Sequence, residues 1–392
     1  MRRLLFVFAL SLACSPITPF RTDAGVDAGP STAGGSGGGF VTTGGGSVSG
    51  GGAAAGGTST AGGSSAAGGS TAGGSTSGGG TAGGSAQTRA FTWSALSYPG
   101  NYAVQSVTAR GNDVYAVTFT GELLHTTGSS LVRVPNFTFA DASDVYLSPS
   151  GKVWVIGTRN NSYVCEGNCT DGASYVQKNN ASATDWFLGV CGDGEQVFAI
   201  AVGTSLEGIL LQYSAGAWRR VTTALGVGNV RNCVVAPNGD VWVSGGAGVS
   251  KVVNGAATPQ PIDLAMQGAA RWQWVALTFD GGTVTDGLLV GTQGGYRLAR
   301  RDTSGTWTAL LPGLTGTDLY GVAAIDDHEF LAVGLSMGGP PFMRFADGGL
   351  SALTPAPPLL ITTDAIWVSS PNEVFVIGQT TSGQRYLYRG VR

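Results

Sequence analysis

A short apolar segment, usually with an aromatic residue at its centre, recurs about every 43 residues from residue 107 to the end of the chain. One further apolar stretch precedes each copy and two follow it, as in residues 208–213 and 216–221, so each repeat contains four short strands. A period in the forties with four strands per unit is typical of a β-propeller. The chain is therefore predicted to be all-β, a seven-bladed β-propeller with four antiparallel strands per blade. The seven copies are residues 113–117, 152–157, 196–200, 240–245, 288–291, 330–334 and 373–378.

Residues that favour tight turns separate the first two strands of several repeats. Residues 148–151 read Ser-Pro-Ser-Gly, residues 236–239 read Ala-Pro-Asn-Gly, and residues 370–373 read Ser-Pro-Asn-Glu. Pro, Asn, Ser and Gly provide the backbone angles that a tight hairpin needs. We therefore expect the first strand to be the innermost of its blade and to form a hairpin with the core strand.

The last repeat is incomplete, because only three residues follow its third strand at residues 384–389. A strand outside the repeats lies ahead of the first blade, at residues 90–96, and has the Trp-x-x-Leu spacing of residues 307–310. We expect this N-terminal strand to complete the last blade and close the ring. Closure removes the open sheet edges that favour aggregation.

The N-terminal segment has the features of an export signal. Two arginines follow Met1, and the apolar run at residues 4–10 is too short to span a bilayer. Cys14 follows a small residue, which resembles the lipobox of bacterial lipoproteins, where signal peptidase cuts before a cysteine that carries the lipid. The resemblance implies a signal peptide at residues 1–13, lipidation of Cys14 and, from Ser15, outer-membrane retention. Cleavage and secretion without a lipid is the alternative.

Residues 14–88 are predicted to form a lipid-anchored stalk ahead of a folded domain at residues 89–392. From residue 31 to residue 86 the chain is nearly all Gly, Ser, Ala and Thr, without a charged residue. Such a composition cannot bury enough apolar surface to offset chain entropy, so we expect a flexible linker. A neutral spacer without a functional length is the alternative interpretation.

Three motifs carry a family resemblance. Residues 370–378 read Ser-Pro-Asn-Glu-Val-Phe-Val-Ile-Gly, residues 318–322 read Asp-Leu-Tyr-Gly-Val, and residues 121–128 read Gly-Glu-Leu-Leu-His-Thr-Thr-Gly. They resemble the repeats of lipid-anchored or secreted bacterial β-propeller proteins, whose blades contain Ser-Pro-Asn-Asp-Val-Trp-Ala-Val-Gly. The resemblance covers the whole domain, but only as repeat motifs, which are structural. It implies the fold and an exported location and assigns no activity.

Charge and composition argue against nucleic acid as a partner. The formal net charge is -3 at pH 7 and charged residues make up 11% of the chain, so a surface that follows phosphates is not expected. Beyond the N-terminal segment the sequence contains no run of about 18 apolar residues, so we expect membrane contact only through the lipid. A monomer is expected.

Candidate catalytic residues are few. The sequence contains two histidines, His125 and His328, in different blades, so neither a Ser-His-Asp triad nor a His-rich metal site can be assembled. Residues 302–307 are a poor match to the Asp-box of sialidase propellers, with one residue too many between Asp and Gly. No catalytic residue, metal or cofactor is predicted, and a non-enzymatic role is favoured. Aspartates that recur at the corner entering the inner strand are expected to accept local backbone hydrogen bonds, with Ca²⁺ binding as the alternative; they are Asp141, Asp185, Asp318 and, nearby, Asp364.

Aromatic and arginine residues near the starts of the inner strands are the candidate ligand-binding residues. Such side chains can line an axial pocket for a sugar or a peptide. Packing between blades is the alternative for the aromatic residues. The candidates are Trp186, Arg231, Arg271, Trp272, Trp274 and Tyr320.

Four cysteines lie beyond Cys14, and export permits disulfides. Cys165 and Cys169 lie where the second blade should turn between its third and fourth strands, so a local disulfide is expected. Cys191 and Cys233 lie on the inner strands of consecutive blades. An alignment on neighbouring valines gives these two the same strand parity, so they should point into different gaps between blades. Two buried free thiols are therefore predicted.

Together these patterns favour a surface-displayed lipoprotein that acts as a binding, adhesion or protein-interaction module, with an unknown protein or glycan as its partner. The expected location is the outer membrane or cell surface. One alternative is an extracellular hydrolase or lyase acting on glycans or peptides at the axial funnel, and another is a scaffold in an envelope assembly. Convergent carboxylates or arginines in the funnel would favour catalysis, whereas an apolar aromatic face would favour binding.

Overall fold

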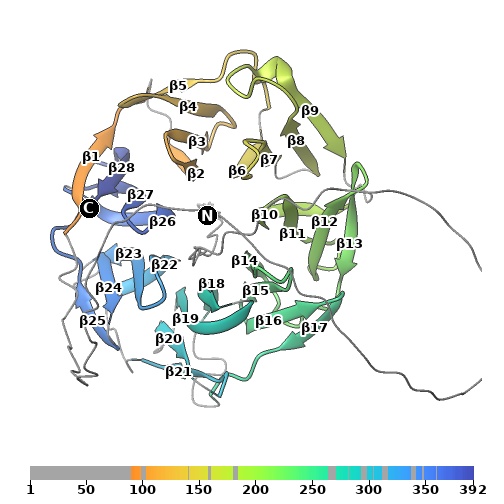
Figure 1. Ribbon diagram of the computed structural model, residues 1–392, viewed down its shortest axis with the longest axis vertical. Helices are drawn as coiled ribbons and strands as arrows, with labels where there is room; N and C mark the ends of the chain where they lie inside the picture. Colours follow the sequence, from red (N-terminus) through yellow and green to blue (C-terminus); the bar gives the residue numbers. More distant parts are fainter. Residues whose placement is uncertain are drawn as a thin grey trace, which may run out of the picture. The chain divides into compact units, whose positions relative to one another are not determined.

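The computed structural model contains seven blades of four antiparallel strands arranged as a ring around a common axis (Figure 1). The seven-bladed propeller predicted from the repeats is therefore confirmed. The signal peptide, the lipidated Cys14 and the stalk predicted before residue 89 lie outside the described residues. The structure describes residues 90–98, 103–139, 141–157, 160–179, 184–263, 271–280, 282–292, 298–302, 304–310, 317–336, 341–346, 348–358 and 360–392.

Consecutive segments of the chain form the first four blades, and the first strand of each is the innermost (Figure 1). Blade 1 contains β2 (Val104–Arg110), β3 (Asp113–Thr118), β4 (Leu123–Thr127) and β5 (Ser130–Arg133). Blade 2 contains β6 (Ala142–Leu147), β7 (Val153–Gly157), β8 (Asn161–Cys165) and β9 (Tyr175–Asn179), with a short 3-10 helix at Gly172–Ser174. Blade 3 contains β10 (Trp186–Asp193), β11 (Gln196–Val202), β12 (Gly208–Ser214) and β13 (Ala217–Thr222). Blade 4 contains β14 (Val230–Val235), β15 (Val241–Gly245), β16 (Gly248–Val253) and β17 (Ala256–Pro259).

The remaining blades follow the same order, except that the outermost strand of blade 7 comes from the other end of the domain. Blade 5 contains β18 (Arg271–Asp280), β19 (Thr283–Thr292), β20 (Leu298–Arg301) and β21 (Trp307–Ala309). Blade 6 contains β22 (Thr317–Ala324), β23 (Glu329–Ser336), β24 (Phe342–Ala346) and β25 (Gly349–Ala352). Blade 7 contains β26 (Leu360–Ser370), β27 (Glu373–Thr380), β28 (Arg385–Val391) and β1 (Thr92–Leu96).

The second strand of each blade is buried on both faces. In β7, Val153 and Val155 belong to the apolar cluster between blades 1 and 2. Trp154 and Ile156 belong to the cluster between blades 2 and 3. Successive side chains of a strand point to opposite faces, so a strand with a neighbour on each side must be apolar throughout. This requirement explains why the repeat is readable as a continuous apolar segment.

The N-terminal strand closes the ring, as predicted. β1 pairs with β28 along its whole length, from Thr92 opposite Val391 to Leu96 opposite Leu387. Leu96 enters the apolar cluster between blades 7 and 1, and Phe91 enters the cluster that blade 7 shares with blade 6. Trp93 of β1 packs against the same cluster as Phe91, which directly precedes the strand, so β1 contributes apolar side chains to both faces of the last blade, as a strand of any other blade does.

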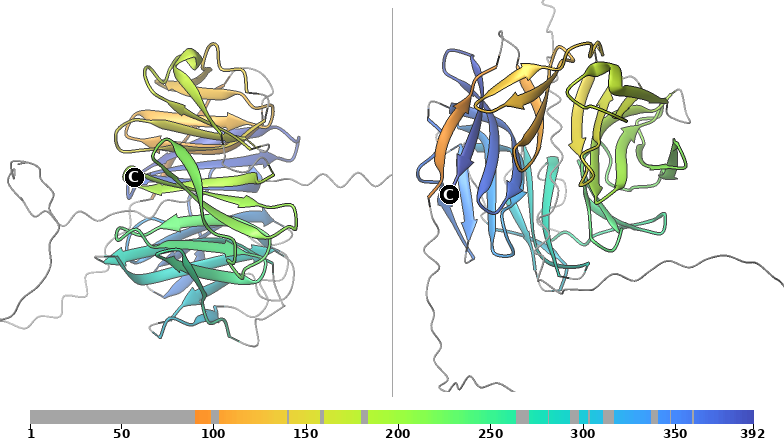
Figure 2. Two further views of the ribbon diagram at one scale, coloured as in Figure 1. Left: turned by 90° about the vertical axis from the view of Figure 1, so that its right-hand side faces the viewer. Right: turned by 45° about the horizontal axis from the view of Figure 1, so that its top comes forward.

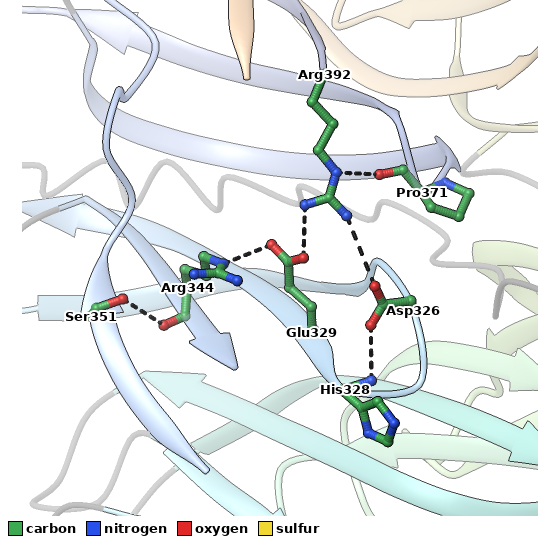
Figure 3. Close-up of polar contacts among 7 residues, drawn as sticks. All are labelled: Asp326, His328, Glu329, Arg344, Ser351, Pro371 and Arg392. Carbon is green, nitrogen blue, oxygen red and sulfur yellow. Dashed lines mark hydrogen bonds and ion pairs between the residues drawn. The ribbon is translucent and has the colours of Figure 1, made fainter. Parts of the chain in front are cut away.

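Arg392 stabilises this closure through polar contacts with blades 6 and 7 (Figure 3). Its Nη1 lies 2.7 Å from Oε2 of Glu329 in blade 6, and its Nε donates to the carbonyl of Pro371 in blade 7 at 2.7 Å. The Arg392 guanidinium also lies 5.0 Å from the centre of the Phe91 ring. Arg344 of β24 binds the other oxygen of Glu329 at 2.8 Å. The buried Glu329 carboxylate thus joins blade 6 to Arg392 at the end of blade 7, and Arg392 in turn contacts Phe91 beside β1.

All seven inner strands have a β-bulge at the same place, which the sequence reading did not predict. In each blade one residue near the start of the inner strand has no partner in the register with the second strand. A bulge bends the strand and re-aims the side chains on either side of it. The bulge residues are Gln105, Ser143, Leu188, Arg231, Gln273, Tyr320 and Asp364.

Both pairs of cysteines form disulfides. The expected bridge between Cys165 and Cys169 is present in the loop that follows β8. Cys191 of β10 is joined to Cys233 of β14, so the prediction of two free thiols was wrong. The bridge fastens the inner strands of blades 3 and 4 to each other.

The strand parity expected for Cys191 and Cys233 was wrong because of the length of a turn. The turn between β10 and β11 is one residue shorter than the turn between β14 and β15. As a result Cys191 lies opposite Phe198. Trp242 is the blade 4 residue equivalent to Phe198, and it lies opposite Val234. Cys191 is therefore equivalent to Val234, and Cys233 is one position away from both. Opposite parity turns the two sulfurs toward the same gap.

Buried polar groups connect the inner strands of the first three blades. Ser106 of β2 donates its hydroxyl to Oδ1 of Asp144 in β6 at 2.5 Å. Oδ2 of Asp144 accepts the backbone N–H of Val190 in β10 at 2.9 Å, and Oδ1 also accepts the N–H of Val145 at 2.9 Å. Burial raises the pKa of the Asp144 carboxyl well above its ordinary value, and the three hydrogen bonds offset this only in part.

We predict that removal of β1 destabilises the ring. A chain that begins at residue 98 lacks Phe91, Trp93 and Leu96 and exposes the edge of β28. Loss of large core side chains costs about 3–5 kcal/mol each in typical cores, so calorimetry should show a lower unfolding midpoint, accompanied by aggregation. A chain that begins at Arg89 is the control and should unfold as the full chain does. Equal midpoints for the two truncations would contradict the closure.

A second prediction concerns the pH dependence of stability. Because the folded pKa of Asp144 is raised, unfolding releases a proton above about pH 4, so its contribution falls as the pH rises toward the folded pKa. The Asp144→Asn chain does not titrate there. The wild-type free energy of unfolding, measured in urea from pH 4 to pH 8, should therefore fall relative to that variant, by at most about 1.4 kcal/mol per pH unit. Asp280→Asn, at an exposed aspartate of β18, is the control, and a pH-independent difference for Asp144→Asn would refute the assignment.

Candidate functional site

The strand ends define two faces of the ring, which Figure 2 shows from the side. Inner strands begin at one face, which also carries the connections between blades and the turns between second and third strands. We call it the crossover face. The turns between first and second strands and between third and fourth strands lie on the opposite face, which we call the hairpin face. Loops on a rigid frame are the usual place for binding residues, so each face is a candidate binding surface.

Two of the predicted ligand-binding residues are core residues. Trp272 is buried in the cluster between blades 4 and 5, and Trp274 is buried in the cluster shared with blade 6. Residues two apart on a regular strand point to the same face, but the bulge at Gln273 separates these two tryptophans. Both therefore pack between blades, which was the alternative interpretation. Arg271 begins β18 at the crossover face, and its side chain lies outside the described residues.

Trp186 and Leu206 present large apolar side chains to solvent on the crossover face of blade 3. Trp186 is the first residue of β10, lies opposite Val202 and is 61% exposed. Leu206 lies in the turn that begins directly after Val202 and is 72% exposed. The strand pairing therefore brings the two side chains to neighbouring strand ends. The sequence reading identified Trp186 and missed Leu206.

The turn that carries Leu206 has a fixed shape. The N–H of Gly203 donates to the carbonyl of Glu207 at 3.1 Å, and the N–H of Leu206 donates to the carbonyl of Gly203 at 3.0 Å. The Glu207 carboxylate accepts the N–H of Ser205 at 3.0 Å. Leu206 adopts a φ of +63°, which costs a residue with a side chain roughly 1–2 kcal/mol. A strained backbone therefore holds an apolar side chain in water.

An ion pair fixes the start of β10. Asp185, directly before Trp186, is fully buried, and its Oδ2 accepts from Nε of Arg220 in β13 at 2.8 Å. A second bond joins Nη2 of Arg220 to Oδ1 of Asp185. These hydrogen bonds raise the pKa of Arg220 above its ordinary value. Asp185, which was expected to accept local backbone hydrogen bonds, thus forms a two-bond ion pair with the outermost strand of its blade, and this pair positions the Trp186 backbone.

The bulge residues of blades 3 to 6 are half-buried at the crossover end of the inner strands, whereas those of blades 1 and 2 are buried. Leu188 packs against the cluster between blades 3 and 4. Arg231 occupies the same position in blade 4, and no described residue forms an ion pair or hydrogen bond with it. Tyr320 occupies this position in blade 6. Two residues predicted from the sequence, Arg231 and Tyr320, thus lie at one level of the ring.

Groups suited to catalysis do not gather on the crossover face of the described structure. His125 packs on Tyr115, with its Nε2 3.5 Å from Oδ1 of Asp113, on the half of blade 1 nearer the hairpin face. His328 lies in the hairpin-face turn between β22 and β23. Asp302, in the Asp-box-like segment, accepts the backbone N–H groups of its own turn. Within the described ranges no cluster of three His, Cys, Asp or Glu residues could hold a metal, and no helix is long and apolar enough to cross a membrane.

A repeated ion pair on the hairpin half of the blades was missed by the sequence reading. In four blades an acidic residue near the hairpin end of the second strand forms an ion pair with an Arg or Lys diagonally across on the third strand, and in blade 1 Asp113 lies in the same way beside His125. Figure 3 shows the pair of blade 6. The repeat register contains the signal, because the acid always lies two residues before the position opposite the base. The pairs are Asp113–His125 (3.5 Å), Asp240–Lys251 (2.7 Å), Asp286–Arg300 (2.7 Å), Glu329–Arg344 (2.8 Å) and Glu373–Arg389 (2.6 Å).

Neither a protein-family model nor a curated protein sequence matches this chain. Solved structures do resemble it. One is described as YCF48 bound to D1 peptide, with 19% identity, a TM-score of 0.53, and coverage of 76% of this chain and 97% of that chain. The WD40 β-propeller domain of Doa1 is 11% identical, with a TM-score of 0.57 over 76% and 96% of the two chains.

A third similar structure is the catalytically inactive H270A virginiamycin B lyase from Staphylococcus aureus with quinupristin. It is 11% identical, with a TM-score of 0.57 and coverage of 77% of this chain and 99% of that chain. Identities this low establish a shared propeller fold and nothing finer, because one fold supports many functions.

Proposed function

We propose that this chain is a protein-interaction module that binds an extended segment or loop of a partner protein on the crossover face of blades 3 and 4. The observation that carries the proposal is the exposure of Trp186 and Leu206, 61% and 72%, at neighbouring strand ends. Large aromatic side chains in this setting are typical energetic centres of protein interfaces. The ion pair beneath Trp186 and the hydrogen-bonded turn beneath Leu206 hold both in place, which lowers the entropy lost on binding.

The neighbouring blade supports the same surface. Arg231, half-buried at the start of β14, has no described partner, and the inner strands β10 and β14 are in contact. A guanidinium on the adjacent inner strand suits a protein segment that carries an acidic or carbonyl group. Leu206 favours a protein over a glycan, because sugars stack on aromatic rings and gain little from an aliphatic side chain.

The comparisons favour binding over catalysis. A similar structure is described with a bound peptide, and another is a WD40 propeller domain. The similar lyase is named by a histidine substitution that inactivates it, but neither His125 nor His328 of this chain lies with Trp186 on the crossover face. Asp144, on the inner strand of blade 2, is already surrounded by three donors. A hydrolase or lyase at this face therefore has less support than a binding module.

The interaction surface can be tested with peptides. The full chain should select ligands from a random peptide library, and Trp186→Ser should weaken the selected peptides about thirtyfold, as for a hot spot of about 2 kcal/mol. Leu206→Ser should weaken them about tenfold. Fluorescence polarisation measures both. Val176→Ser is the matched control, because Val176 is 40% exposed on the outer strand β9. If no peptide is selected, or if all three variants bind alike, the proposal fails.

We also propose that Cys14 carries a lipid that displays the propeller on the outer membrane or cell surface. The apolar run at residues 4–10 and the small residue before Cys14 support this proposal. The charge-poor segment at residues 31–86 would then serve as the stalk.

Lipidation of Cys14 makes a direct prediction. In a bacterium with an outer membrane, the full chain should incorporate a clickable fatty acid and fractionate with membranes, and Cys14→Ala should lose both properties. Cys169→Ala, which removes a cysteine of the folded domain, is the control and should keep the label. Mass spectrometry of a mature chain that begins elsewhere than Cys14 without an added lipid would overturn the proposal and favour simple secretion.

A further inference from the structure

A cavity of about 380 Å³ opens on the hairpin face between blades 5 and 6, opposite the surface proposed for protein binding. Its walls come from the hairpin of β18 and β19, from β20, and from the turn between β22 and β23. The cavity is lined by Phe279, Asp280, Asp286, Arg300 and Asp327, together with Thr285 and His328. A volume of this size accommodates a small organic molecule or one long side chain of a partner.

The cavity exists because one hairpin departs from the repeat. In the other six blades the first and second strands are not paired beyond the residue equivalent to Asp286 toward the hairpin tip. β18 and β19 continue beyond it, through a bulge, to the pair Asp280–Thr283. At the tip, Gly282 has a φ of +90°, and a Cβ there would lie 2.7 Å from the side chain of Asn238 in blade 4. The tip of the longer hairpin thus packs against blade 4, and the cavity lies on the side of the hairpin that faces blade 6.

The charges in the cavity decide which kind of ligand it suits. Arg300 is already committed, because its Nε and Nη2 bind Asp286 at 3.0 and 2.7 Å and its guanidinium lies 5.0 Å from the Phe345 ring. Asp280 and Asp327 have no ion-pair partner among the described residues. The cavity thus has three carboxylates against one guanidinium and the His328 imidazole, and the excess is negative. An anionic ligand would meet repulsion here, whereas a cation would be attracted.

We propose that this cavity binds an organic cation, namely an alkylammonium or guanidinium group. Asp280 and Asp327 provide the counter-charge, and charge-assisted hydrogen bonds from the ligand N–H groups satisfy their oxygens. Phe279, which is 7% exposed, lines the cavity with an aromatic ring, and cations bind favourably over the face of such a ring. The group can belong to a free amine or to a lysine or arginine side chain of a second protein.

Isothermal titration calorimetry of the full chain tests the site with three probes. They are 1,4-diaminobutane, the peptide acetyl-Gly-Gly-Arg-Gly-Gly-amide, and succinate as a dianion of similar length. We expect at least one cationic probe to bind and succinate not to bind. Asp280→Asn and Asp327→Asn should each weaken binding by roughly tenfold, because each substitution removes one charge without changing the shape of the side chain. Binding of the amine alone assigns the site to free amines, and binding of the peptide alone assigns it to a protein side chain.

Two control variants separate this site from the rest of the surface. Asp113→Asn removes an exposed carboxylate from blade 1, at the position equivalent to Asp286, and should leave cation binding unchanged. Trp186→Ser, on the opposite face, should also leave it unchanged, so failure here and failure of the peptide-binding proposal are distinguishable. The proposal is overturned if neither cation binds at millimolar concentration, if succinate binds equally, or if the Asp280→Asn and Asp327→Asn chains bind as the wild type does.

Discussion

Each blade of this propeller is apolar on both faces, so no blade can bury its core without a neighbour on either side. This constraint requires a closed ring, and the N-terminal strand satisfies it. β1 completes blade 7 and contributes Leu96 to one gap and Trp93 to the other, where Phe91, directly before β1, is buried. Glu329, bound by Arg344 and Arg392, adds the polar counterpart of the same closure (Figure 3). Because the inner frame is rigid, side chains at its crossover end are held in place before any partner arrives.

The sequence contains most of the fold, and its limits are physical. Continuous apolar segments predict the central strands, because a strand between two packed faces has no polar positions. Register depends on features with no apolar signature. A turn shorter by one residue reversed the expected parity of Cys191 and Cys233, and a bulge at Gln273 directed Trp272 and Trp274 into different gaps. Parity arguments from sequence alone fail wherever one residue is inserted or removed.

The candidate site was only partly readable for a related reason. Trp186 stood out as an aromatic residue near the start of an inner strand, but a tryptophan at that position is exposed or buried according to the strand parity. Leu206 gave no signal, because a lone leucine in a turn resembles any surface residue until its exposure and backbone are known. The five cross-strand pairs, in contrast, follow one rule of spacing and could have been found from the repeat alignment.

The closing strand also determines how the domain meets mechanical tension. Any pull transmitted along the chain from residues before Ala90 enters the fold through β1, which is held to blade 7 by backbone pairing and side-chain contacts, without a disulfide. The first contacts to bear this load are the Phe91 ring against Arg392 and the hydrogen bond from Trp93 Nε1 to the Pro355 carbonyl at 2.9 Å. These side chains reinforce the end at which peeling would begin. A partner bound to blade 3 would pull against that end. The Cys191–Cys233 bridge joins blades 3 and 4 and does not strengthen the pairing of β1 with β28.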